Sequence, residues 1–212
     1  MLIAAVLWFV MFSPWTAPYL NFWWAMSASA LVLMGLAWTG RATWGNGAHE
    51  AHGAYEAYRA YGAYGAYRIV GIGLLIAVAL WLVFWVGDKV SQWLFHFARQ
   101  QVDLIYGMKD GMSPWMLSLL LLCIIGPAEE IFWRGYVQRT LAQRWSPNVA
   151  FVVTTAIYAL VHLPSLNFML IMAALVCGVA WGGLYRLMPE RLPAIILSHA
   201  LWDAAAFVWF PL

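Results

Sequence analysis

The stretch IVGIGLLIAVALWLVFWVG, residues 69–87, decides the fold class of this chain. It contains no charged residue, and a helix of this length crosses the hydrocarbon core of a bilayer. The whole sequence agrees with it, since 65% of the 212 residues are hydrophobic and only 9% are charged. A soluble domain would carry about a quarter charged residues. We therefore predict an all-α, polytopic integral membrane protein.

Further apolar runs of similar length recur along the chain. They lie near residues 2–20, 22–40, 147–163, 166–187 and 192–210, and a shorter run at 113–126 continues without a strong stop into 127–145. We join the last two as one helix with a kink at Gly126-Pro127, which predicts a helical bundle of about seven transmembrane helices. The first run starts at Met1 with no Lys or Arg before it, so we interpret it as a retained span.

The chain is predicted to form a single transmembrane domain over residues 1–212. Within it, the triplet repeat AYE-AYR-AYG-AYG-AYR at residues 54–68 has a period that suits neither a buried helical stripe nor a strand. We predict a low-complexity loop over residues 41–68, with tyrosines lying on the membrane surface. The stretch WLFHFARQQVDLIYGMK, residues 93–109, mixes apolar and charged residues and predicts an interfacial amphipathic helix.

Charge and cysteine content exclude other classes of protein. The net charge of +2 and the lack of a basic cluster with interleaved aromatic residues predict no nucleic-acid partner. Cys123 and Cys177 both lie in apolar runs, so they indicate small hydrophobic residues rather than a disulfide framework. With seven spans, the positive-inside rule puts the N-terminus in the cytoplasm, and a count changed by one would invert this orientation.

Ionisable residues inside the predicted spans are few and fall into three motifs. The motifs are GPAEEIFWRGY at 126–136, YALVHLP at 158–164 and LSHALWDAAAF at 197–207. Each such residue costs roughly 2.5–3.5 kcal/mol on insertion scales and is a functional hypothesis by default. The candidate site residues are Glu129, Glu130, Arg134, His162, His199 and Asp203.

The spacing of these residues predicts which of them meet. Glu130 and Arg134 are four residues apart, so they share a helix face and can pair, whereas Glu129 points about 100° away. The same spacing relates two further pairs, Tyr158 with His162 and His199 with Asp203. A helical hairpin at Trp145-Ser146 would bring Glu129 and His162 to the same depth, about 24 Å from the turn.

These side chains suit the hydrolysis of an amide bond. A carboxylate beside an imidazole, as with Glu129 and His162, can hold a water molecule and take its proton. A second imidazole with a hydrogen-bonding neighbour, as with His199 and Asp203, can stabilise an oxyanion. The pair of Glu130 with Arg134 would fix the helix.

The pattern E-E-x-x-x-R, then aromatic-x-x-x-His, then His-x-x-x-Asn/Asp resembles the CPBP family, which includes the type II CAAX prenyl proteases and the bacterial Abi proteins. The resemblance covers a catalytic core at residues 113–207, and the matching positions are Glu129-Glu130-x-x-x-Arg134, Tyr158-x-x-x-His162 and His199-x-x-x-Asp203. It implies an intramembrane endopeptidase in which Glu129 and His162 activate water, with an oxyanion site at His199 and Asp203.

Two positions depart from the family pattern. Tyr158 stands where Phe is usual, and Asp203 stands where the prenyl proteases have Asn. An ionised carboxylate cannot donate a hydrogen bond to an oxyanion, so Asp203 must be protonated or must instead orient His199.

Several alternatives stay open at the level of sequence. We expect no required cofactor, but a zinc-dependent version of the same protease would use Glu129, His162 and His199 as ligands. Other readings are a non-catalytic membrane immunity or binding protein of the Abi type, and a proton-coupled transporter, which would need an inverted repeat. The segment His49-Glu50-Ala51-His52 lacks the histidine spacing of the zincin helix.

The expected partners are the lipid bilayer and a membrane-embedded or membrane-anchored protein or peptide substrate. The expected location is a prokaryotic cell membrane. In the sixth span, Gly178, Gly182 and Gly183 are expected to allow close helix packing.

Overall fold

The computed structural model describes the backbone of residues 1–43 and 47–212, and the side chains of residues 1–40 and 65–212. The described backbone is helical and contains no strand. Its α-helices are α1 (Leu2–Phe12), α2 (Phe22–Thr43), α3 (Gly47–Leu94), α4 (Ala98–Gly107), α5 (Pro114–Leu120), α6 (Gly126–Phe132), α7 (Arg139–Arg144), α8 (Pro147–Leu160), α9 (Phe168–Leu187) and α10 (Leu192–Ala204). Short 3₁₀ turns form η1 (Ala17–Tyr19), η4 (Leu163–Ser165) and η5 (Pro189–Arg191), and π-helical segments form η2 (Leu121–Ile125), η3 (Trp133–Gln138) and η6 (Ala205–Trp209).

Six helices in the described part are long and apolar enough to cross a membrane. They cover Phe22–Gly40, Gly65–Leu94, Pro114–Arg144, Pro147–Ser165, Phe168–Leu187 and Pro189–Trp209. The predicted all-α membrane bundle is confirmed, and the predicted count of about seven agrees roughly with these six. The difference lies at residues 2–20, where α1 has only 11 residues. Pro14 forces Ser13 into an extended conformation, which ends the helix well short of a span.

The loop predicted over residues 41–68 is wrong where the backbone is described. α2 continues to Thr43 and α3 begins at Gly47, so the Ala-Tyr-x repeat is the first part of a helix that runs on into the apolar span. Ala is the strongest helix former, and its propensity outweighs the missing 3.6-residue pattern. Residues 44–46 and the side chains of residues 41–64 lie outside the described residues, including the expected surface tyrosines and the segment His49-Glu50-Ala51-His52.

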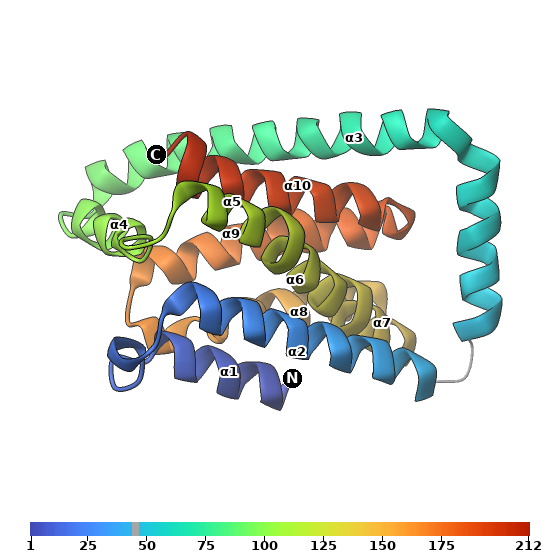
Figure 1. Ribbon diagram of the computed structural model, residues 1–212, viewed down its shortest axis with the longest axis horizontal. Helices are drawn as coiled ribbons and strands as arrows, with labels where there is room; N and C mark the ends of the chain where they lie inside the picture. The colour runs from blue at the N-terminus through green and yellow to red at the C-terminus, as the bar shows by residue number, and fades with distance from the viewer. Residues whose placement is uncertain (44–46) are drawn as a thin grey trace.

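The predicted amphipathic segment contains α4, which is hydrogen-bonded to the start of α9. The backbone oxygen of Gln101 accepts a hydrogen bond from Asn167 Nδ2 over 2.8 Å. The Gln101 side-chain oxygen accepts another from the Met169 backbone N–H over 3.0 Å. α4 therefore covers the end of the bundle that lies away from the turn between α7 and α8 (Figure 1).

The helix that carries both glutamates lies in the middle of the bundle. α3 and α10 lie side by side along one side, and α1 and α2 lie along the opposite side (Figure 1). α6 packs against both α2 and α10. The predicted hairpin at Trp145-Ser146 is present, since α7 ends at Arg144 and α8 begins at Pro147. The Ser146 side chain accepts a hydrogen bond from the backbone of the first turn of α8, which caps the new helix.

Glycines bring several helices into close contact. A Cβ atom at Gly178 or Gly182 would lie 3.1–3.3 Å from neighbouring side chains, so the expected close packing is confirmed at these two positions. At Gly183 a Cβ would make only ordinary contacts. A closer approach occurs at Gly126, where a Cβ would lie 2.8 Å from the Cα of Ala200. α6 and α10 therefore touch backbone to backbone beside the candidate site.

Candidate active site

Glu129 and Glu130 lie in α6, a short α-helical segment between the π-helical segments η2 and η3. Pro127 has no backbone N–H to donate, and the hydrogen-bond register changes directly before it. There the Gly126 N–H donates to the carbonyl oxygen of Leu121, five residues back. The break predicted at Gly126-Pro127 therefore takes the form of a π-helical turn, a feature that is frequent at functional sites.

Glu129 is buried, with a single hydrogen-bond partner among the described side chains. Its Oε2 accepts a hydrogen bond from the Tyr158 hydroxyl over 2.9 Å. Tyr158 lies in α8, so this bond joins the two arms of the hairpin. The guanidinium carbon of Arg134 lies 4.8 Å from the centre of the Tyr158 ring, which places a positive charge over the face of the tyrosine.

Glu130 is fully buried and connects two different helices. Its Oε1 accepts from Nη1 of Arg134 over 2.7 Å, as the four-residue spacing predicts. The same oxygen lies 2.7 Å from Nδ1 of His199 in α10. Arg134 also donates from Nη2 to the carbonyl oxygen of Cys177 in α9, over 3.4 Å. Glu130 and Arg134 therefore hold α6, α9 and α10 together.

The ring of His199 is held on three sides. It stacks on Trp181, with ring centres 3.8 Å apart and an angle of 19° between the planes. Its Nδ1 faces Glu130, and its Nε2 lies 3.4 Å from Oδ2 of Asp203. Because both nitrogens face carboxylate oxygens, the ring can donate to both when it carries two protons. The predicted pairing of His199 with Asp203 is confirmed.

His162, the first residue after α8 and its cap, is held in one tautomer. Its Nδ1 lies 2.8 Å from the carbonyl oxygen of Tyr158. A carbonyl can only accept, so Nδ1 carries the proton. The lone pair on Nε2 accepts a hydrogen bond from the indole N–H of Trp8 over 3.3 Å. Tyr158 therefore contacts Glu129 through its hydroxyl and His162 through its carbonyl.

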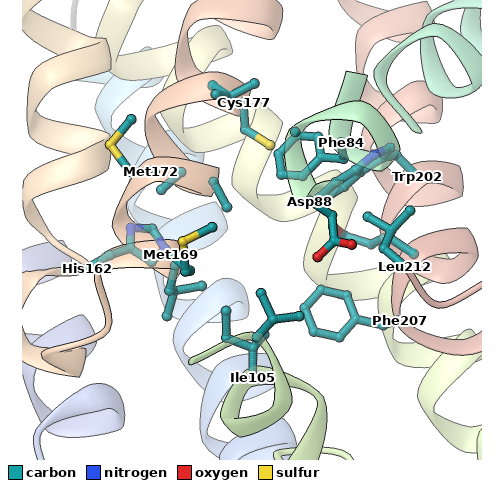
Figure 2. Close-up of a pocket in the computed structure, with 18 of the residues that line it drawn as sticks. Phe84, Asp88, Ile105, His162, Met169, Met172, Cys177, Trp202, Phe207 and Leu212 are labelled. Atoms are coloured by element: carbon teal, nitrogen blue, oxygen red, sulfur yellow. The ribbon is translucent and has the colours of Figure 1, made fainter. Parts of the chain in front are cut away.

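A cavity of about 470 Å³ joins these groups. Its lining includes four of the six candidate residues, Glu129, His162, His199 and Asp203, together with Tyr158. Most of the other lining residues are apolar, including Met169, Met172 and Phe207, which surround the space that His162 faces in Figure 2. Glu130 and Arg134 are not part of the lining, so they lie behind the cavity wall.

Residues 111–205 match the family model described as type II CAAX prenyl endopeptidase Rce1-like. This region contains all six candidate site residues, from Glu129 to Asp203. The resemblance to the CPBP family is confirmed. Searches of curated proteins and of solved structures gave no match. The CAAX-protease match indicates an intramembrane protease in general, a hydrolase that lies in a lipid bilayer and acts on a peptide. The single-domain organisation and the prokaryotic membrane stay predictions.

The three motifs converge as their spacing predicts, and their residues separate into two groups. Glu129, His162, His199 and Asp203 face the cavity, whereas Glu130 and Arg134 form a buried support. Among the described residues, no hydrogen bond joins Glu129 directly to His162. The catalytic roles of all six residues stay predictions.

The zinc-dependent alternative is likewise untested. Within the described part of the chain, no three His, Cys, Asp or Glu side chains are grouped so that they could hold a metal ion. Both ring nitrogens of His162 and of His199 already have partners. Binding a metal through these two rings would therefore require them to exchange partners.

Three features of the candidate site were missing from the sequence-based prediction. Trp8 comes from α1, outside the matched region, and nothing separates it from the other tryptophans of a chain that has 15. The role of the Tyr158 hydroxyl could have been predicted from the sequence, since this hydroxyl is the one group by which Tyr differs from the usual Phe. Asp88 lies near the end of α3 and also lines the cavity. The sequence feature that could have indicated Asp88 is a carboxyl residue directly after a long apolar run.

Proposed function

We propose that this chain is an intramembrane endopeptidase in which Glu129 takes a proton from the water that attacks a peptide carbonyl. The observation that carries the proposal is the difference between the two adjacent glutamates. Glu129 lines the cavity, and among the described residues its carboxyl accepts a side-chain hydrogen bond from the Tyr158 hydroxyl alone. Glu130 lies behind the wall and is bound to Arg134 and His199. A general base must reach the water, so Glu129 fits this role.

In the first step the water oxygen forms a bond to the peptide carbonyl carbon while one water proton moves to Glu129. The carbonyl oxygen becomes an oxyanion. We assign its stabilisation to the Nε2–H of His199, which would be shared between the oxyanion and Asp203. In the second step the C–N bond breaks, the carbonyl re-forms, and the proton moves from Glu129 to the leaving amine nitrogen. Glu129 is then ready for the next water.

His162 would position the attacking water. Its Nδ1–H stays on the Tyr158 carbonyl, so only the Nε2 lone pair can accept a hydrogen bond from water. Trp8 uses that lone pair, over a rather long 3.3 Å. We infer that a water molecule exchanges with the indole N–H when the site is loaded. Glu129 and His162 would then hold the two hydrogens of one water.

The direct test is hydrolysis of an internally quenched apolar peptide by the purified protein in proteoliposomes. Glu129→Gln should lower turnover by about 10²–10⁴-fold, the usual contribution of a general base. The thermal unfolding transition should not change. Glu190→Gln is the matched control, because Glu190 is exposed in η5, just after α9, and within the described part of the chain its carboxyl pairs with Arg191 alone. Turnover by the Glu129→Gln protein at the wild-type rate would overturn the proposal.

The same assay distinguishes a zinc-dependent protease from a metal-independent one. The wild-type protein is exchanged into buffer with a strong chelator, and turnover is measured before and after zinc is restored. Turnover that survives chelation supports general-base catalysis by free Glu129. Loss of turnover that only zinc reverses would make Glu129 a metal ligand instead.

A further inference from the structure

Asp88 is a buried carboxyl that the proposed mechanism does not use. It lies near the end of α3 and is only 7% exposed. Its Oδ2 accepts from Nζ of Lys89 over 3.0 Å and from Nε2 of Gln92 over 2.6 Å. Its Oδ1 is buried and has no hydrogen-bond partner among the described residues. A buried carboxylate oxygen without a donor is costly, so it calls for an explanation.

The unpaired oxygen belongs to a side chain that points into the cavity of the candidate active site. Asp88 lines this cavity together with Glu129 and His162. Figure 2 shows the Asp88 carboxyl and the His162 ring on opposite sides of the space, with Phe207 and Leu212 beside the carboxyl. Lys89, by contrast, is 57% exposed and does not line the cavity.

The carboxyl groups of the cavity can bind a cation. Three carboxyl side chains line it, those of Asp88, Glu129 and Asp203, together with two histidines, His162 and His199, and no Lys or Arg is among its described lining residues. His199 lies beside Asp203 and Glu130, so its charge is already matched by these carboxyls. Tyr106, also in the lining, adds no negative charge, because burial raises the pKa of its hydroxyl. That hydroxyl already donates to the carbonyl of Ala206 and accepts from the Leu212 N–H.

The walls near Asp88 suit a side chain with an apolar stem and a charged end. Phe84 and Trp202 lie next to each other with ring centres 4.6 Å apart, and Figure 2 shows both beside Asp88. Lys and Arg side chains bury their methylene stems against apolar surface and extend their charged end to a polar partner. Aromatic faces also attract such cations.

We propose that Asp88 forms a specificity subsite that binds a Lys or Arg side chain of an otherwise apolar peptide substrate, while the peptide bond lies at Glu129. This inference rests on the proposed protease function, since it concerns the substrate of the same cavity. The basic side chain would bind the Asp88 carboxyl, whose Oδ1 has no donor among the described residues. The subsite would also disfavour peptides with an acidic side chain at that position.

Binding can be tested without hydrolysis on a Glu129→Gln background. The probes are fluorescent apolar decapeptides that carry a single Lys at successive positions, each matched by a peptide with norleucine, which keeps the stem and lacks the ammonium. At one position the Lys peptide should bind about tenfold more tightly than its norleucine match, as a charge-assisted hydrogen bond predicts. With Asp88→Asn this ratio should fall below about twofold.

Asp103→Asn is the matched control, because Asp103 in α4 is 57% exposed, pairs with Arg99 and does not line the cavity. It should leave the ratio at its original value. Equal binding of Lys and norleucine peptides at every position, or a ratio that Asp88→Asn does not change, overturns the subsite. Neither result depends on turnover, so failure of the subsite and failure of Glu129 as the base are separate outcomes.

A second measurement uses the unmodified chain and so does not depend on how Asp88→Asn folds. A hydrophobic carbodiimide joins an amine to a carboxyl that lies in contact with it. With the best Lys peptide bound, the cross-link should map by mass spectrometry to the proteolytic fragment that contains Asp88. A cross-link only to the fragments that contain Glu129 or Asp203 would overturn the proposal.

Discussion

The hydroxyl of Tyr158 donates a hydrogen bond to Oε2 of Glu129 over 2.9 Å, in a fully buried setting. The carbonyl of the same tyrosine accepts from Nδ1 of His162 over 2.8 Å. One residue thus contacts both members of the proposed water-activating pair, through two different atoms. The Phe that is usual at this position in the family would keep the second contact and lose the first.

Tyr158→Phe should therefore lower kcat/KM for peptide hydrolysis by roughly 10–100-fold, because a hydrogen bond to a charged group is worth about 1.5–3 kcal/mol. The helix and the His162 contact should persist, so the unfolding temperature should change little. Tyr19→Phe is the matched control, since the Tyr19 side chain is exposed. Steady-state kinetics in proteoliposomes measure the effect. A variant as active as the wild type would mean that Glu129 needs no partner on this side.

Glu130→Gln should lower both stability and rate, unlike Glu129→Gln. The substitution leaves the buried guanidinium of Arg134 without a counter-charge, and breaking a buried pair costs about 3–5 kcal/mol. Since Gln keeps one acceptor oxygen, we expect a fall of roughly 5–10 °C in the unfolding temperature in detergent. If instead Glu130→Gln abolished turnover in a fully stable protein, and Glu129→Gln unfolded it, the roles of the two glutamates would have to be exchanged.

The parts of this site that the sequence predicts are those set by local spacing. The pair of Glu130 with Arg134 and the pair of His199 with Asp203 follow from a separation of four residues on a helix. The turn at Trp145-Ser146 follows from a polar break between two apolar runs. Each of these needs information from one or two neighbouring helices only.

The contacts that escaped prediction join helices distant in sequence. Trp8 reaches His162 from α1, 154 residues away, and no periodicity relates the two. The bond between Glu130 and His199 spans 69 residues and depends on how α6 and α10 pack. The loop prediction, which is wrong at residues 41–43 and 47–68, has a different cause. There the helix forms through the propensity of its residues, without an amphipathic pattern. A sequence read in isolation cannot supply packing partners of this kind.

Gly126→Ala should disturb the site through the backbone of α10. A Cβ at residue 126 would lie 2.8 Å from the Cα of Ala200, next to His199, and backbone cannot move aside as a flexible side chain can. We expect a loss of about 1–3 kcal/mol of stability and a lower kcat. Gly183→Ala is the matched control, because its Cβ would make only ordinary contact with Phe151. Thermal unfolding and kinetics report both effects, and an unchanged Gly126→Ala protein would show that the two helices can separate freely.

Asp203→Asn tests whether Asp203 orients His199 or acts by its charge. The Asp203 carboxyl lies 3.4 Å from Nε2 of His199, and an amide oxygen can accept from the same nitrogen. Asp203→Asn, which introduces the residue of the prenyl proteases, should keep kcat/KM within about threefold of the wild type, whereas Asp203→Ala should lose roughly tenfold. Equal losses in the two variants would show that the negative charge itself is required.

Trp8→Phe tests whether α1 supports the candidate site, whose six candidate residues all lie in the matched region 111–205. The Trp8 side chain is fully buried, donates to Nε2 of His162 and packs edge-on against Trp133 at 6.3 Å between ring centres. Removing the donor and part of the ring should destabilise the protein by about 1–3 kcal/mol, which lowers the unfolding temperature by several degrees. Trp115→Phe, at a side chain that is 83% exposed, should have no such effect. If both variants unfold at the wild-type temperature, the contacts of Trp8 with His162 and Trp133 do not stabilise the fold.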